Sequence, residues 1–300
     1  MQTRSLVVVA DDYGIGPEVS RGILELMRAG TVTGTVLLVN SPYVEEDVRL
    51  WKKAGRVGEM GWHPNLTMDA PAASATEVPS LLDENGQLAS LGKLLLRMNT
   101  GRVRYEEIVR ELDAQFRRFC DLVGHPPALL NGHKHIHVFP MVGRALREVL
   151  ERWNVRPYVR RVVDPWTCLR RIPGARIKRL FLSTFGRRAA IRQDRAGFTG
   201  NEYLAGITDP KWVKDPEFFA RWLACVPGRV VELAVHPGHF DETLIVRDCS
   251  RTDGQLERRV DEQRLLSHPD FPAACTRAGF TLCSASQIGQ SGKESLRHVA

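Results

Sequence analysis

The sequence predicts an α/β protein with parallel strands, arranged as an open sheet or a closed barrel. Short apolar runs rich in β-branched residues alternate with segments whose apolar residues recur at helical spacing. Polar residues of the kinds that bind metals or transfer protons directly follow several of these runs, on the carboxyl side where α/β folds place their sites. No repeat, low-complexity tract or linker interrupts residues 1–300, so we expect a single domain.

Strands and helices alternate clearly in the first 130 residues. Residues 6–10 read L-V-V-V-A, a continuous apolar run typical of a parallel strand buried on both faces. Pro17 suits the first turn of a helix, apolar residues then recur at helical spacing, and Gly30 ends the helix. The same criteria predict strands at 33–39, 57–62 and 127–130, helices at 42–54 and 105–123, and a loop at 79–92.

The alternation continues toward the C-terminus. Residues 230–235 read V-V-E-L-A-V and predict another buried strand. We expect an extended segment at 155–159, a last short strand at 280–283, and helices at 141–153, 216–225, 256–266 and 271–278. This pattern alone fits an open sheet and a barrel equally well, because helices connect parallel strands in both.

The composition is typical of a soluble globular protein, with 43 % hydrophobic and 26 % charged residues. No apolar run approaches the roughly 18 residues of a membrane-spanning helix, and the apolar run near the N-terminus is shorter than a signal-peptide core. We therefore expect a cytoplasmic protein. Its six cysteines include no C-x-x-C pair, which favours reduced buried thiols over a structural zinc site.

Positive charge is concentrated between residues 156 and 195. This segment contains twelve Arg or Lys and two Asp, a formal charge of +10, whereas the whole chain carries +7. Within 167–193, apolar residues fall at helical spacing among the basic ones, namely Ile177, Leu180, Phe181 and Phe185. We favour a solvated helix that packs on the rest of the domain. The alternative is an interfacial helix that contacts anionic lipid or a lipid-linked sugar phosphate at the inner membrane surface. Nucleic acid is disfavoured, because no recognised binding motif accompanies the charge.

Two adjacent carboxylates, Asp11 and Asp12, follow the first predicted strand. Adjacent acids at a strand end repel each other unless a cation or hydrogen-bond donors compensate. Their side chains point in different directions, so one could bind a metal while the other acts as a base. A helix cap or a solvated turn is the ordinary explanation of such a pair. His63, in G-W-H-P-N-L-T after the third strand, is likewise an ordinary histidine when considered alone.

The strongest local signal is the run N-G-H-K-H-I-H at residues 131–137. Its three histidines, His133, His135 and His137, would share one face of an extended chain because side chains alternate along a strand. Neutral imidazole is the commonest metal ligand in proteins. We therefore expect this run to serve metal binding or catalysis.

His236, in H-P-G after the strand at 230–235, completes a pattern across four strands. Asp or His follows each of them, and a parallel sheet or barrel brings their carboxyl ends to one face. One Asp with two His is a typical ligand set for a divalent metal with open positions. The remaining Asp and His are the residue types that a hydrolase needs as base and acid. The sequence therefore predicts a metal-dependent hydrolase.

These motifs resemble the YdjC-like carbohydrate deacetylases, a family that includes chitooligosaccharide deacetylases and hopanoid-associated members. The matching stretches run in the same order to about residue 241: A-D-D-Y-G-I, R-G-I-L-E-L-M-R-A-G-T-V-T-G-T-V-L-L-V-N, G-W-H-P-N-L-T, N-G-H-K-H-I-H-V-F-P and V-E-L-A-V-H-P-G. The combination is specific, whereas each piece alone is weak. Two departures concern the substrate: Asn131 stands where members often have Asp, and Pro64 replaces a larger apolar residue.

The resemblance implies an irregular TIM-like (β/α) barrel and one divalent metal ion, zinc or magnesium. It implies that Asp12, His63 and His133 bind this ion. It also implies that Asp11 is the general base and His236 the general acid. Substrate-binding or orienting roles fall to Tyr13, Asn65, Asn131, His135 and His137, and, in a loop similar to one near the family's sugar pocket, to Phe198 and Tyr203.

The implied reaction is removal of an acetyl group from an N-acetylated sugar, oligosaccharide or lipid-linked glycan. Two alternatives remain open. The same ligands would serve a hydrolase of another amide or of a phosphoester. A sugar- or metal-binding protein without turnover is disfavoured, because binding needs no spare base and acid. No feature of the sequence indicates an oligomer interface.

Overall fold

The computed structural model describes residues 4–289, and its centre is one sheet in which every pair of neighbouring strands is parallel. The strands are ordered β5-β4-β3-β2-β1-β7-β6, with β8 also paired to β1. Their bounds are β1 Arg4–Tyr13, β2 Gly34–Leu37, β3 Glu59–Trp62, β4 Leu129–Leu130, β5 Tyr158–Val159, β6 Tyr203–Ala205, β7 Val230–Val235 and β8 Phe280–Leu282.

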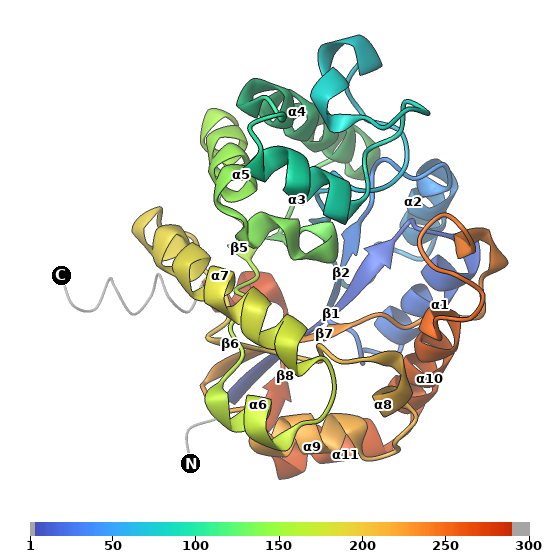
Figure 1. The fold of residues 1–300 in the computed structure, drawn as a ribbon. Helices are drawn as coiled ribbons and strands as arrows, with labels where there is room; N and C mark the ends of the chain where they lie inside the picture. Colours follow the sequence, from blue (N-terminus) through green and yellow to red (C-terminus); the bar gives the residue numbers. More distant parts are fainter. Residues whose placement is uncertain (1–3, 290–300) are drawn as a thin grey trace.

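The sheet curls into an irregular barrel (Figure 1), and single backbone hydrogen bonds link each outer strand of this order to the chain next to the other outer strand. The backbone N–H of Val159, in β5, donates to the carbonyl of Thr199 at 2.8 Å, and that of Leu204, in β6, donates to Val163 at 2.9 Å. The irregularity has a visible cause, because β4 and β5 are only two residues long. The expected α/β, TIM-like barrel fold is confirmed.

Helices surround the sheet (Figure 1). They are α1 Pro17–Arg28, α2 Val44–Lys53, α3 Leu91–Asn99, α4 Tyr105–Val123, α5 Pro140–Arg152, α6 Trp166–Arg171, α7 Arg176–Arg195, α8 Pro210–Val213, α9 Phe218–Cys225, α10 Gln255–Ser267 and α11 Asp270–Arg277. The central strand β1 is buried from Leu6 to Tyr13, and the apolar faces of the helices pack around it. Burial on both faces explains why β1 is a continuous apolar run rather than an alternating one.

Most expected elements are present with small shifts of their ends, and α4 has the bounds that its apolar stripe predicts. Three elements differ. Helix α3 begins at the end of the expected loop, and β6 and α8 were not expected. Both β6 and α8 are four residues or shorter, so neither shows a full period of apolar residues by which to recognise it.

The basic segment forms α6 and α7, and α7 packs on the barrel as the favoured interpretation expected (Figure 1). Its buried residues include Leu182, Gly186 and Ala189, whereas Ile177 is 87 % exposed. Within the described part of the chain, the structure contains no helix that is both long and apolar enough to cross a membrane.

Gly186 fixes how closely α7 approaches the barrel. A Cβ atom there would lie 1.8 Å from the carbonyl oxygen of Val162, so an alanine would force the backbones apart. We expect Gly186→Ala to lower the free energy of unfolding by about 1–3 kcal/mol, despite the better helix propensity of alanine. Urea denaturation measures this effect. Gly92→Ala, in α3 with open space around the added carbon, is the control and should not destabilise the protein; equal destabilisation of both variants would contradict the close-approach argument.

Candidate active site

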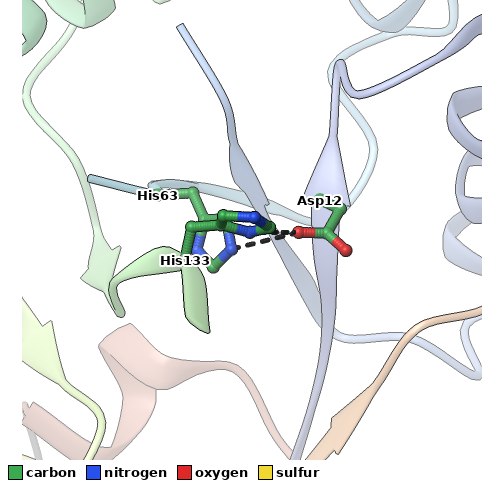
Figure 2. Close-up of side chains that lie close together, drawn as sticks. All are labelled: Asp12, His63 and His133. Carbon is green, nitrogen blue, oxygen red and sulfur yellow. Dashed lines mark hydrogen bonds and ion pairs between the residues drawn. The ribbon is translucent and has the colours of Figure 1, made fainter. Parts of the chain in front are cut away.

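Three side chains from different strands meet at one end of the barrel. Asp12 lies near the end of β1, His63 directly follows β3, and His133 follows β4 (Figure 2). Asp12 Oδ1 is 3.2 Å from His63 Nε2 and 3.0 Å from His133 Nδ1. One ligand atom from each of the three residues lies within 4.8 Å of the others, and all three residues are buried. The expected meeting of strand ends therefore brings these three residues together.

The tautomer of His63 tests whether this trio fits a metal ion. His63 Nδ1 lies 2.8 Å from the carbonyl oxygen of Asn131, and a carbonyl can only accept, so Nδ1 carries the proton. In the neutral ring, Nε2 then presents a lone pair toward the carboxylate of Asp12, with no hydrogen bond of good geometry. Two such lone pairs repel each other unless a metal ion or a proton lies between them. One carboxylate and two imidazoles are a donor set that divalent metals accept, so the residues fit a metal ion.

The environment of His133 supports the same conclusion. Burial opposes a charged ring, yet the carboxylates of Asp12 and Asp248 raise the pKa of His133 to about 9. Asp248 Oδ1 is 3.7 Å from His133 Nε2. The site thus favours positive charge at His133. Asp248 is placed to orient this ring, and its position in the chain, far from any motif, gave no signal in the sequence.

Replacing Asp248 with asparagine should weaken metal binding about 10–100-fold, because a carboxylate behind a histidine ligand fixes the ring and raises its basicity. Zinc titration of the metal-free protein measures this. Asp270→Asn removes an exposed carboxylate from α11 and is the matched control. Unchanged zinc affinity in Asp248→Asn would mean that Asp248 does not support the ligand.

Asp11 points to a second set of partners. Its carboxylate forms a bidentate ion pair with the buried guanidinium of Arg160, at 2.6 and 2.7 Å, and accepts a hydrogen bond from Asn131 Nδ2 at 3.3 Å. Arg160 also pairs with the buried Glu232. Burial alone would raise the pKa of Asp11, but Arg160 outweighs burial and holds the pKa well below its usual range. Asp11 is therefore an ionised, fixed carboxylate, separate from the trio of Asp12, His63 and His133.

His236, after β7, faces Asp11 across the site. Its Nε2 is 3.7 Å from Asp11 Oδ2. On the other side of the ring, a guanidinium nitrogen of Arg258 lies 3.3 Å from Nδ1. Burial and the charge of Arg258 lower the pKa of His236 to about 4, so the ring is neutral near pH 7. The short distance between His236 Nε2 and Asp11 Oδ2 favours proton exchange between the two side chains. The lowered pKa means that His236 is not already protonated when the reaction begins.

Removing the Arg258 cation should raise the pKa of His236 from about 4 toward its ordinary value. The imidazolium would then persist to higher pH in Arg258→Gln, because one of the two causes that disfavour it is gone. An NMR pH titration of the ring proton of His236 measures the shift. Arg264→Gln, on the solvent side of the same helix α10, is the control. A pKa that does not rise would show that burial alone sets it.

The H-x-H-x-H run does not have the expected geometry. We expected an extended chain with three histidines on one face, but residues His133–Val138 form a 3-10 helix, with Lys134 and His135 in the left-handed region at φ 52° and 58°. His137 consequently turns away from the site. Its Nδ1 accepts from the N–H of Gly132 at 2.9 Å, and Nε2 is 3.1 Å from the carbonyl of Arg160. His137 thus supports the loop that carries His133.

A cavity of about 790 Å³ opens over these groups. One wall is polar and includes Asp253 and two arginines of α10, Arg258 and Arg259. Arg259 bonds to Asp12 Oδ2 at 2.7 Å and so holds the free oxygen of that carboxylate. The other wall is largely apolar and comes from α3 and α7: Leu91, Leu95, Ile177, Phe181 and Leu182. A cavity of this size accommodates a small ligand.

Several predicted site residues lie elsewhere. Tyr13 is buried in the core, where its hydroxyl donates to the carbonyl of Asp47. Asn65 is buried and braces its own loop by bonding to Met68 and Thr67. Phe198 lines a different cavity, described below, and Tyr203 lies at the amino end of β6, away from the strand ends that carry the site. His135 lines the cavity over the metal trio, and Asn131 contacts Asp11.

Residues 5–277 match the family model described as YdjC-like protein. The chain belongs to the YdjC-like family. A relative from Klebsiella pneumoniae (strain 342), named chitooligosaccharide deacetylase, is 36 % identical over 287 residues, which cover 93 % of this chain and 97 % of the relative. A Mus musculus protein named carbohydrate deacetylase is 38 % identical over 154 residues, about half of this chain (50 %) and of the mouse protein (48 %).

Among solved structures, a protein of Enterococcus faecalis V583 described as a candidate cellobiose-phosphate cleavage protein has a TM-score of 0.74. It is 22 % identical in sequence, and the match covers 96 % of this chain and 99 % of that one. This likeness shows that the two chains share a fold.

Sequence reasoning missed the charged groups that complete the site. Arg160 follows β5, Asp248 lies in a loop, and Arg258 and Arg259 lie on α10. Arg160 and Arg258 each belong to an Arg-Arg pair that is part of no recognised motif, so only the fold reveals that they contact Asp11 and His236.

Proposed function

We propose that this YdjC-like protein is a metal-dependent hydrolase that removes the acetyl group from an N-acetylated sugar or oligosaccharide. The observation that carries this proposal is the meeting of Asp12, His63 and His133 at one point, with Asp11 and His236 beside them. The names of the relatives support the same reaction, since they are called carbohydrate or chitooligosaccharide deacetylases.

Asp12, His63 and His133 would hold the metal ion. Two imidazoles and one carboxylate favour zinc over magnesium, because magnesium prefers oxygen ligands throughout. When bound, the ion would polarise the acetyl carbonyl and lower the pKa of water. His63 is fixed for this role by Asn131, His133 by Asp248 and Asp12 by Arg259.

Asp11 would act as the general base. It accepts a proton from the water that attacks the acetyl carbon, while Arg160 keeps the carboxylate in place. The low pKa of Asp11 keeps it ionised at neutral pH, so the base is available without prior deprotonation. Its position rather than its basicity would make it effective.

His236 would act as the acid. Because it is neutral in the free protein, the reaction itself replaces the proton that it delivers. Arg258 donates toward Nδ1, so the neutral ring carries its proton on Nε2, 3.7 Å from Asp11 Oδ2. Water gives a proton to Asp11, and His236 Nε2 gives its own proton to the sugar nitrogen as it takes up the one from Asp11. The carbon–nitrogen bond then breaks to give acetate and a free amino sugar, and the second proton of the attacking water passes to the released amine or to solvent.

The apolar wall of the cavity would contact the part of the substrate beyond the acetylated sugar. Ile177 and Phe181 line the cavity and are also exposed at its edge, and the neighbouring Leu180 is 53 % exposed. These side chains support the proposal that the substrate is a sugar with an apolar group, such as a lipid-linked glycan. They also support the proposal that residues 167–193 contact a membrane surface. We place the reaction in the cytoplasm.

Acetate release from a panel of substrates tests the proposal. The panel contains N-acetylglucosamine, chitobiose, longer chitooligosaccharides and octyl N-acetylglucosaminide, each with zinc, with magnesium and with chelator. Metal-dependent release of acetate together with an equal amount of free amine is the expected result. Hydrolysis of 4-nitrophenyl phosphate but of no N-acetyl sugar would favour the phosphoester alternative, and binding of chitobiose without turnover would favour a binding protein.

A further inference from the structure

A second cavity lies between α5 and the C-terminal half of α7. It has a volume of about 430 Å³, within the usual range for small-molecule sites. Its floor is formed by Leu130 of β4, Val159 of β5 and His137, and its walls by both helices. Phe198, which resembles part of a family sugar-binding loop, lies here rather than over the metal trio. The proposed hydrolysis makes no use of this cavity.

The charge of this cavity is one-sided. Among the residues that the structure describes, no carboxylate lines it, whereas four arginines do: Arg144, Arg147, Arg192 and Arg195. Arg147 has a 3.7 Å ion pair with Glu151, and Arg144 lies over the ring of Tyr105. Within residues 4–289, neither Arg192 nor Arg195 has an ion pair. Guanidinium groups without a carboxylate partner are ready to bind an anion in bidentate fashion.

The interior of the cavity is apolar, with one polar group left open. Val138, Phe139, Leu146 and Phe198 provide hydrocarbon and aromatic surface. Gln193 lies among the arginines on α7, and its buried Oε1 has no hydrogen-bond partner in the described part of the chain. Buried polar atoms normally have a partner. A ligand that enters the cavity with a hydroxyl group or a protonated acid would supply one.

The cavity is separate from the active site. Phe139 stands between the two, because it lines both and packs against Phe181 and Phe185 of α7, at ring distances of 6.4 and 5.4 Å. A ligand here would not reach the metal trio directly. It would lie against His137, which hydrogen-bonds to the loop that carries His133.

We propose that this cavity is a second binding site, for an organic anion that combines an apolar body with one carboxylate or phosphate group. The apolar body occupies the space around Phe139 and Phe198, and the arginines at the rim bind the anionic group. The assignment does not depend on the proposed deacetylation, because it rests on a cavity that the reaction does not use.

Calorimetric titration with octyl phosphate tests this assignment, and octanoate tests a carboxylate in place of the phosphate. Two controls each lack one part of the ligand: inorganic phosphate has no apolar chain, and octanol has no anionic group. We expect one site for octyl phosphate or octanoate. Inorganic phosphate and octanol should bind at least about tenfold more weakly, since each loses either the charge-assisted bonds or the burial of hydrocarbon.

Two variants locate the site. Arg192→Glu/Arg195→Glu should weaken binding at least about tenfold, whereas Arg170→Glu/Arg171→Glu makes the same charge change on α6, outside the cavity, and should leave it unchanged. Ala189→Phe fills the cavity without altering charge and should also abolish binding, with thermal unfolding confirming that it folds. Equal affinity in the cavity variants and wild type, or no binding by folded wild type, would overturn the assignment.

Discussion

Asp11→Asn should abolish acetate release while leaving the metal in place. Asp11 lies next to Asp12, the proposed metal ligand, but its carboxylate is turned toward Arg160 and Asn131 rather than toward His63 and His133. The substitution removes the proton acceptor and keeps the size of the side chain. General-base catalysis contributes about 10²–10⁴-fold, so kcat should fall by that factor. Paired measurements of kcat and of bound zinc check both parts of the prediction.

Asp164→Asn is the matched control for Asp11→Asn, because Asp164 is also a buried carboxylate paired with a buried arginine, Arg179, but lies outside the active-site cavity. Any loss of activity that follows from breaking a buried ion pair should occur in both variants. A loss confined to Asp11→Asn assigns the effect to chemistry. Full activity in Asp11→Asn would remove the base role from this residue.

His133→Ala should lose the metal, and His137→Ala should keep it. The two histidines belong to one motif, are both buried, and differ in direction: His133 faces Asp12, whereas His137 bonds to backbone groups. Loss of a ligand should weaken zinc binding by more than about 100-fold, since loss of a residue behind a ligand already costs about 10–100-fold. His137→Ala should instead lower thermal stability, because it leaves backbone groups of Gly132 and Arg160 without partners.

Zinc content after dialysis, measured for both variants beside wild type, decides this comparison. If His133→Ala retains zinc and His137→Ala loses it, the assignment of the ligands within the motif is wrong. An H-x-H-x-H run that bound metal with one face of an extended chain would lose zinc in both variants, so the comparison also tests the 3-10 geometry of residues His133–Val138.

The parts of the fold that the sequence could predict are those with a full repeat of apolar residues. The continuous run of β1 and the stripe of α4 determine their own structure, and parallel pairing then brings Asp12 and His63 to one end of the barrel. Strand order therefore predicts that such residues meet, whereas the choice of Asp12, His63 and His133 among them came from the family resemblance. The three-residue β6 has no such repeat and becomes a strand only because β7 pairs with it.

The direction of side chains in loops was harder to predict. The spacing of His133, His135 and His137 indicates a shared face only if the backbone is extended, and two left-handed residues remove that condition. Arg160 and Asp248 act through contacts between segments more than 100 residues apart in the chain, 149 residues in the case of Arg160 and Asp11. Such pairs depend on tertiary packing, for which a single sequence contains no local pattern.

Acetate release from chitobiose, followed while zinc is titrated into metal-free protein, tests the central proposal most directly. If Asp12, His63 and His133 form one catalytic metal site, activity should rise linearly and stop at about one equivalent of zinc, and chelator should reverse it. Acetate release that is unaffected by chelation, or a fully zinc-loaded protein that releases no acetate from chitobiose or any other N-acetyl sugar of the panel, would contradict the proposal.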